Sequence, residues 1–287
     1  MFGFLNINKP KGMTSHDVVA KLRKITKIKQ IGHTGTLDPL AEGVLPIAIG
    51  KASRLIEYLK EDKAYIAKLE FGKISDTYDI EGSISEYSNK KITQNEIEKA
   101  LKNFIGTIQQ TPPAYSAIHY NGKRLYELAR EGNIPDEIPK RTVTIETCDL
   151  KSFNQEQQIA EIEIKCSKGT YIRSIVHDLG MNLQTGAIMT ELTRTKSGKF
   201  VFDKSIKLKD LIDKQTVENN LINPIEMLNI NSLTVNDNEV EKIKHGQAIP
   251  TDKFKENEII CLNYNSKICA IGEKKGSLIL TKKVFIQ

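Results

Sequence analysis

Residues 32–45 read Gly-His-Thr-Gly-Thr-Leu-Asp-Pro-Leu-Ala-Glu-Gly-Val-Leu, a segment that surrounds Asp38 with three glycines and Pro39. Glycine lets a backbone approach a ligand closely, and proline biases the preceding residue toward an extended conformation. By local composition alone, the segment is typical of a tight turn in which the Asp38 carboxylate hydrogen-bonds its own backbone. Residues 32–50 as a whole are rich in glycine and proline, which predicts a loop.

The bulk composition indicates a globular protein with a substantial core. The chain has 287 residues, of which 39% are hydrophobic and 27% are charged. This length favours one large domain plus a small one. The sequence lacks an apolar run long enough to span a bilayer, and residues 1–6 lack the features of a secretory signal. We therefore expect a cytoplasmic protein with no membrane association.

Four cysteines are spread along the chain without any C-x-x-C pair: Cys148, Cys166, Cys261 and Cys269. This spacing predicts reduced thiols and argues against a zinc site or a disulfide framework. The net charge of +6 is a mild excess, compatible with a polyanionic partner without requiring one. Basic residues gather at Lys21, Arg23 and Lys24, a pattern that more often marks a solvated helix face than a binding site.

Hydrophobic periodicity predicts a mixture of strands and helices. Alternation over residues 63–71 is typical of a strand, and Thr93 to Glu96 form a capping box at the start of a helix. The expected strands are 3–8, 63–71, 142–150 and 158–166, and the expected helices are 15–27, 53–60, 94–106 and 171–184. Because the order lacks a regular β-α-β alternation, we expect an α+β fold with a mixed, largely antiparallel sheet and helices packed on it.

The composition and the apolar pattern of the sequence change near residue 230. Short apolar runs at 258–262, 268–271 and 277–280 follow a stretch that is rich in asparagine. These runs predict a small β-rich domain over residues 230–287, behind a catalytic domain over residues 1–229. A unit of this size is near the lower limit for independent folding, so we expect it to be stabilised by packing against the main domain.

Several common catalytic motifs are missing from the sequence. It contains no G-x-S-x-G elbow, no Walker-type phosphate loop and no H-E-x-x-H helix. The adjacent pair His177 and Asp178 falls in a predicted helix, where neighbouring side chains point in different directions, which makes a poor metal site. We therefore expect chemistry that uses side chains alone, with no metal and no cofactor.

The segment around Asp38 resembles the signature of the TruB-type pseudouridine synthases, which modify uridine 55 in the T loop of tRNA. Further segments are similar to other motifs of that family, in the same order, between about residues 3 and 200: 8–15, 63–65, 75–82, 112–117 and 166–174. Several ordered motifs are far more specific than one glycine-rich loop. Glu42 departs from the family, which often has threonine there, and we expect this difference to tune the loop. The resemblance implies the pseudouridine synthase fold and a PUA-like C-terminal domain.

The resemblance also implies the roles of three catalytic residues. Asp38 is the essential carboxylate, acting as a nucleophile or as a base that removes a sugar proton, and the sequence leaves both routes open. Arg173 is the cation that stabilises the charged form of Asp38. Tyr65 lies against the target uracil and assists proton transfer from C5. Alternatives from the residues alone are a turn aspartate, a solvated helix arginine and a core tyrosine on an alternating strand.

The remaining predicted contacts concern the RNA. By resemblance, Tyr171 and Leu192 line the uracil pocket, and His33 lies at the disrupted RNA loop, although a structural histidine in a turn is the alternative. The target base must be extruded, which costs a few kcal/mol. The candidates for contacts to the phosphate backbone are Lys9, Lys21, Arg23 and Lys24.

The expected partner is the T arm of tRNA, bound by a monomer without a protein partner. Three rival interpretations remain. The first is an RNA-binding or tRNA-folding protein on the same scaffold. The second is a guide-RNA-dependent relative, although such proteins usually have a clearer PUA domain. The third is an unrelated hydrolase that uses Asp38, for which no residue that activates water is apparent.

Overall fold

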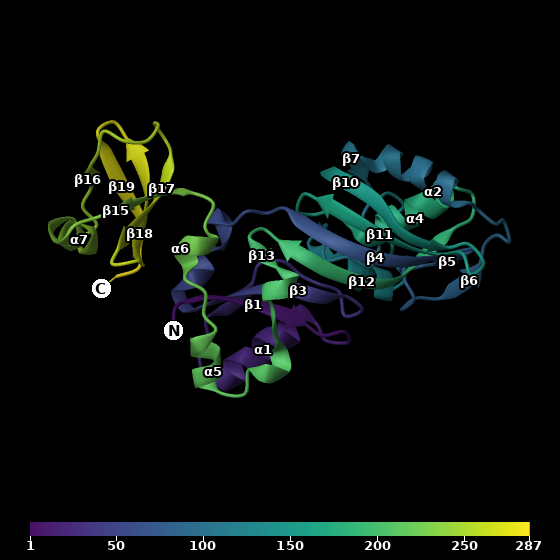
Figure 1. Cartoon of the computed structure of the whole chain (residues 1–287), viewed down its shortest axis with the longest axis horizontal. Helices are drawn as coiled ribbons and strands as arrows, with labels where there is room; N and C mark the ends of the chain where they lie inside the picture. Colours follow the sequence, from purple (N-terminus) through teal and green to yellow (C-terminus); the bar gives the residue numbers. More distant parts are fainter. Residues whose placement is uncertain (287) are drawn as a thin grey trace.

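The protein is described here by a computed structural model that covers residues 1–286. One large sheet fills most of the molecule, and a smaller β-rich unit, which carries the C-terminus, lies at one end (Figure 1). The order of the strands is not sequential, since β3 lies between β1 and β12 while β4 lies beyond β12.

The large sheet has ten strands and is mixed but largely antiparallel. Its order is β14 (Ile206–Lys207), β1 (Gly3–Lys9), β3 (Glu42–Ile49), β12 (Ala187–Ser197), β4 (Lys63–Phe71), β11 (Ile159–Cys166), β10 (Arg141–Asn154) and β7 (Gly106–Gln110), with β2 (Ile31–His33) beside β3 and β13 (Phe200–Val201) beside β12. The parallel pairs are β1 with β14 and β3 with β12. Two hairpins, β5 (Lys73–Ser75) with β6 (Ile84–Glu86) and β8 (His119–Tyr120) with β9 (Lys123–Arg124), complete this part.

Helices pack on both faces of this sheet. The α-helices are α1 (Ser15–Thr26), α2 (Gln94–Leu101), α3 (Leu125–Arg130), α4 (Ile172–Asn182), α5 (Lys214–Asn219) and α6 (Pro224–Met227), and the 3₁₀ helices are η1 (Gly50–Tyr58), η2 (Lys102–Phe104), η3 (Phe202–Lys204) and η4 (Leu208–Asp210). The apolar stripes of α1, α2 and α4 join one hydrophobic core with the facing strand residues. The prediction of an α+β fold with helices packed on a mixed sheet is confirmed.

The predicted loop over residues 32–50 is wrong in its second half. Residues 42–49 form β3, a strand whose side chains from Val44 to Ile49 are all buried. A strand that is covered on both faces has a continuous apolar run and no alternation of apolar and polar residues. Because that alternation is absent here, the glycines and prolines of the segment led to the prediction of a loop. The strand β12, in the middle of the sheet, was missed, and the expected helix over 53–60 is the 3₁₀ helix η1.

The smaller unit has five strands in the order β15 (Asn231–Thr234), β17 (Ile259–Tyr264), β18 (Lys267–Lys275), β19 (Leu278–Val284) and β16 (Ile249–Pro250), with α7 (Asp237–Lys244) beside them. It packs on the face of the large sheet opposite to α1, where Phe4 and Leu55 share an apolar cluster with Ile271 and Phe285. The domain boundary at residues 229 and 230 stays a prediction. No helix of residues 1–286 is long and apolar enough to cross a membrane.

Candidate active site

The loop that carries Asp38 connects β2 to β3 and is held by the segment after β1. The Ser15 hydroxyl accepts from the Leu37 amide at 2.8 Å and lies 3.2 Å from the Leu37 carbonyl. The fully buried Lys9 ammonium donates to the carbonyl oxygens of Met13 at 2.6 Å and Pro39 at 3.5 Å. These bonds fix the backbone on both sides of Asp38 without using its carboxylate.

Lys9 is therefore not the exposed phosphate contact that the sequence predicted. Its side chain has no exposed surface, and burial lowers its pKa to about 8, against the opposing effect of Asp38. The long lysine stem allows the ammonium to reach several carbonyls of a curved backbone at once. In the structure, Lys9 holds the backbone of the loop that carries Asp38.

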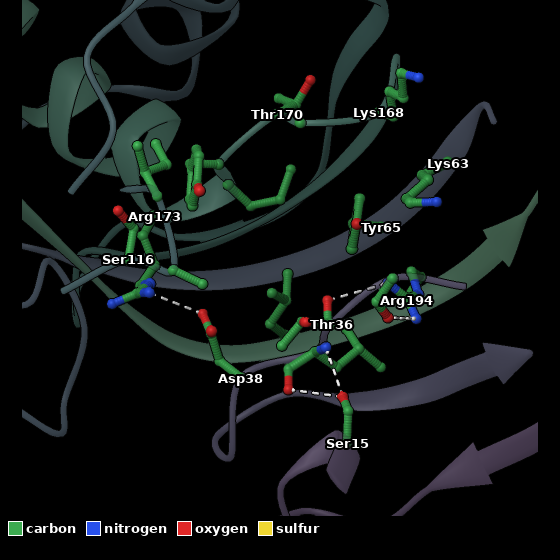
Figure 2. A pocket seen from close by; sticks show the side chains of 18 of the residues that line it. Ser15, Thr36, Asp38, Lys63, Tyr65, Ser116, Lys168, Thr170, Arg173 and Arg194 are labelled. Carbon is green, nitrogen blue, oxygen red and sulfur yellow. Dashed lines mark hydrogen bonds and ion pairs between the residues drawn. The ribbon is translucent and has the colours of Figure 1, made fainter. Parts of the chain in front are cut away.

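A single buried guanidinium joins two carboxylates at the bottom of the pocket. Arg173 Nη2 lies 3.0 Å from Asp38 Oδ2, and Arg173 Nη1 lies 3.3 Å from Asp79 Oδ2. The Arg173 side chain is 8% exposed and that of Asp79 is 2% exposed, whereas the Asp38 side chain keeps 38% of its surface open. Asp38 is thus the member of this group that faces the pocket, as Figure 2 shows.

Arg173 occupies the first turn of α4 and is fixed on every side. Its Nη1 donates to the Thr77 carbonyl at 3.1 Å, and its Nη2 donates to the Tyr115 carbonyl at 3.0 Å. The planar fork of arginine suits this pattern because its donors point in fixed directions. The expectation that Arg173 lies beside Asp38 agrees with this geometry, while its role in the reaction stays a prediction.

The predicted uracil-binding residues surround the same pocket. Tyr65 on β4 is buried, and burial raises its pKa while the nearby Arg194 opposes this effect. Leu192 on β12 is 6% exposed and lines the pocket together with Tyr65 and Tyr171. Tyr171 precedes α4, and its amide donates to Gln110 Oε1 at 2.7 Å. The structure therefore brings all three together with Asp38 and Arg173.

The pocket itself is open and has a volume of about 850 Å³. It lies where β3 meets β12, a pairing of only two registered positions, Glu42 with Thr193 and Gly43 with Arg194. Gly43 is required at this junction, because its φ is +104° and a Cβ atom would lie 2.4 Å from the Arg194 carbonyl oxygen. The volume is within the range of sites that bind a nucleotide-sized ligand.

His33 and the basic residues of α1 lie elsewhere. His33 ends β2, and its ring packs edge-on against that of His16, with the ring centroids 5.2 Å apart. Burial and His16 lower the pKa of His33 to about 4, which leaves it neutral near pH 7. It is His16 that lines the pocket. Arg23 donates to the Ile31 carbonyl at 3.0 Å.

Lys21, Arg23 and Lys24 are exposed on α1 and do not line the pocket. Their contacts with an RNA backbone stay a prediction. His33 likewise stays a predicted RNA contact, one that would act from beside the pocket and not from its wall.

Three charged residues of this region were not assigned from the sequence: Asp79, Lys63 and Arg194. Asp79 belongs to the quoted motif 75–82, and its neighbours Ser75 and Thr77 hydrogen-bond to it at 2.6 Å, so the motif itself was the available signal. Lys63 stands two residues before Tyr65 on β4 and therefore on the same face. Arg194 lies in β12, a strand that the hydrophobic pattern did not reveal.

Asp79→Asn is expected to slow the reaction by up to about 10²-fold, because a small misplacement of catalytic groups has effects of that size. The amide removes the charge that holds Arg173 Nη1, so the guanidinium loses its fixed position beside Asp38. Steady-state kinetics should show a lower kcat with little change in KM. Asp76→Asn is the matched control, since Asp76 is an exposed carboxylate of the same loop that bonds the Ser83 amide. Equal rates in both variants would remove Asp79 from the positioning of Arg173.

Comparison with known proteins identifies the family of the chain. Residues 23–172 match the model of the TruB family pseudouridylate synthase N-terminal domain, and residues 173–228 match the tRNA pseudouridylate synthase B C-terminal domain. The tRNA pseudouridine synthase B of Heliobacterium mobile is 43% identical over 276 residues, which cover 94% of this chain and 89% of that protein. That of Clostridium novyi is 49% identical over 212 residues, covering 74% and 72%.

A solved structure extends the similarity to the whole fold. The crystal structure of a Cbf5-Nop10-Gar1 complex contains a chain that is 26% identical, with a TM-score of 0.74, covering 99% of this chain and 85% of that one. The family models together span most of the residues that build the sheet and the pocket. The chain belongs to the TruB family of pseudouridylate synthases, and it is an isomerase.

Proposed function

We propose that this protein converts uridine 55 in the T loop of tRNA to pseudouridine, with Asp38 as the essential carboxylate. The observation that carries this proposal is the Asp38 side chain, which is open to the pocket and paired at 3.0 Å with the buried Arg173. The tRNA substrate is supported by relatives named tRNA pseudouridine synthase B that are more than 40% identical over most of the chain.

Amino-acid side chains suffice for the chemistry of this reaction. The N1–C1′ bond of the uridine breaks, a C5–C1′ bond forms, the hydrogen on C5 leaves and N1 gains one, so nothing is oxidised or hydrolysed. An ionised carboxylate serves either as the nucleophile or as the base. The Arg173 guanidinium favours the ionised form of Asp38 and orients it. Tyr65 offers a ring face against which the detached uracil turns.

RNA binding is supported by the charges around the mouth of the pocket. Arg124, Arg130, Arg141 and Lys168 line the pocket and are exposed. Such cations neutralise phosphates and supply affinity that does not depend on sequence. Holding a nucleotide outside its loop costs a few kcal/mol, and contacts to the phosphate backbone together with burial of the uracil offset this cost.

The proposal is tested with two tRNA transcripts that lack modifications, one with uridine 55 and one with cytidine at this position. Pseudouridine should form in the first transcript at position 55 and should be absent from the second. Product at another uridine of the second transcript would mean that the proposed target is wrong. If neither transcript reacts but the protein speeds their refolding, the tRNA-folding alternative replaces the proposal.

A further inference from the structure

The pocket has a second charged end, formed by Lys63 on β4 and Arg194 on β12. Figure 2 shows both side chains on the side of the pocket away from Asp38 and Arg173, with Tyr65 between the two groups. At the Asp38 end, the guanidinium of Arg173 faces two carboxylates. The end formed by Lys63 and Arg194 has two cations and therefore the opposite sign.

Neither cation at this end has a carboxylate partner among the ion pairs of residues 1–286. Within the described residues, the hydrogen bond from Lys63 Nζ goes to the Ser197 hydroxyl, at 3.2 Å. The nearest carboxylates in sequence are already occupied, because Asp62 pairs with Lys196 at 2.9 Å and Glu61 pairs with Lys168 at 2.6 Å.

Arg194 is also held without an anion. It is 1% exposed, and its guanidinium donates to the carbonyl oxygens of Val44 at 2.6 Å, Gly35 at 3.2 Å and, by a long bond from Nη1, Thr36 at 3.4 Å. These carbonyls fix the arginine and leave its full positive charge in place. Burial, and then the charge of Arg194, lower the pKa of Lys63 to about 8. A buried cation without a counter-ion is costly, so the pair is suited to receive an anion.

Gly35 lies beside both cations. A Cβ atom at Gly35 would lie 3.7 Å from Lys63 Nζ and 3.8 Å from Arg194 Nη1, so both nitrogen atoms lie close to this one glycine. Gly35 belongs to the loop that carries Asp38. An anion bound here would therefore contact the same loop that carries the reacting carboxylate.

We propose that Lys63 and Arg194 form a phosphate subsite that binds a backbone phosphodiester next to the target uridine. This inference rests on the proposed function and adds to it the anchor that orients the nucleotide. With a phosphate held at this end, the ribose points toward Asp38 and the uracil lies against Tyr65. Lys63 is a substrate-binding residue in this account, and the bond-making group remains Asp38.

The first test measures RNA binding by Lys63→Met over a range of salt concentrations. The dissociation constant for the unmodified tRNA transcript should rise roughly tenfold, the size expected for one charge-assisted hydrogen bond. The slope of log affinity against log salt should fall by about 0.7 to 0.9, the value for one phosphate. Lys68→Met is the matched control, because Lys68 lies on β4, faces away from the pocket and pairs with Glu191. It should change neither quantity.

The second test identifies the phosphate. Transcripts carry one neutral methylphosphonate, placed in turn at each linkage on either side of uridine 55, and are assayed with wild type and Lys63→Met. One linkage should weaken binding to the wild type about as much as Lys63→Met does, with no further loss when both changes are combined. Lys63→Arg should restore most of the affinity.

The outcomes separate this inference from the proposed function. Wild-type binding and salt slope in Lys63→Met, or fully additive losses at every linkage, would overturn the phosphate subsite while pseudouridine formation remained. Absence of pseudouridine with the wild type would instead overturn the proposed function. A lower rate of Lys63→Met with unchanged affinity would also overturn the subsite, because a ground-state phosphate contact acts on binding.

Discussion

An Asp38→Asn variant is expected to form pseudouridine on the order of 10⁴-fold more slowly than the wild type while it still binds tRNA. Asparagine has nearly the same size as aspartate but is neither a base nor an effective nucleophile. The loop should keep its shape, since Lys9 and Ser15 hold its backbone and do not touch the carboxylate. Arg173 also keeps its contacts to Asp79 and to two carbonyls.

The measurement for Asp38→Asn is the release of tritium from C5 of uridine under single-turnover conditions, because the reaction removes that hydrogen. Asp203→Asn, an exposed carboxylate outside the pocket, is the control and should keep the wild-type rate. If Asp38→Asn lost its affinity for tRNA as well, the carboxylate would serve binding more than catalysis. A rate within tenfold of the wild type would exclude Asp38 as the reacting group.

Arg173→Met is expected to lower the rate on the order of 10²-fold or more and to destabilise the fold by about 3–5 kcal/mol. The methionine leaves Asp38 and the buried Asp79 without their shared cation, and an uncompensated buried charge has a large cost. The carbonyl oxygens of Thr77 and Tyr115 also lose their donor. Thermal unfolding and single-turnover rates at a temperature well below the unfolding midpoint measure the two effects separately.

Arg173→Lys separates the charge from the geometry. A single ammonium keeps the positive charge but cannot reach Asp38, Asp79 and the two carbonyl oxygens in the fixed directions of the guanidinium. We expect Arg173→Lys to keep most of the stability and the tRNA affinity of the wild type, with a rate still far below that of the wild type. An unchanged rate in Arg173→Lys would remove the guanidinium from the active site and leave it a structural role.

Local patterns in the sequence predicted some elements well. The alternation of Tyr65, Ala67 and Leu69 identified β4 with the bounds that the structure has, and the capping box between Thr93 and Glu96 is present at the start of α2. In both cases the information lies within a few neighbouring residues. Patterns of this kind depend on strand alternation and on hydrogen bonds between residues three apart.

The arrangement of the site could not be predicted from such patterns. Asp38, Tyr65 and Arg173 lie on different elements, and the pairing of β12 with both β3 and β4 helps to bring them together. Their shared role was expected only because each belongs to a motif that resembles the same family. The pairing that links β3 to β12 joins residues far apart in the chain, and periodicity carries no signal for it.

The burial of Lys9 is another feature that the sequence could not predict. Lysine is rarely buried without a charged partner, so an exposed phosphate contact was the natural prediction. The structure buries Lys9 among carbonyl oxygens of a tight loop, an environment that exists only after the chain has folded around Asp38. Lys63 is the reverse case. Among residues 1–286 its ammonium has no carboxylate partner, which becomes informative only because the neighbouring Glu61 and Asp62 pair with other lysines.

The central claim is that the Asp38 pocket isomerises one uridine of tRNA and neither hydrolyses nor merely binds it. It is tested most directly by incubating the wild type with an unmodified tRNA transcript at equal concentrations and analysing every nucleotide of the product by mass-resolved sequencing. We predict one pseudouridine, at position 55, in an uncleaved chain with no free uracil. Free uracil, a cleaved chain, or a transcript recovered unchanged would contradict the account.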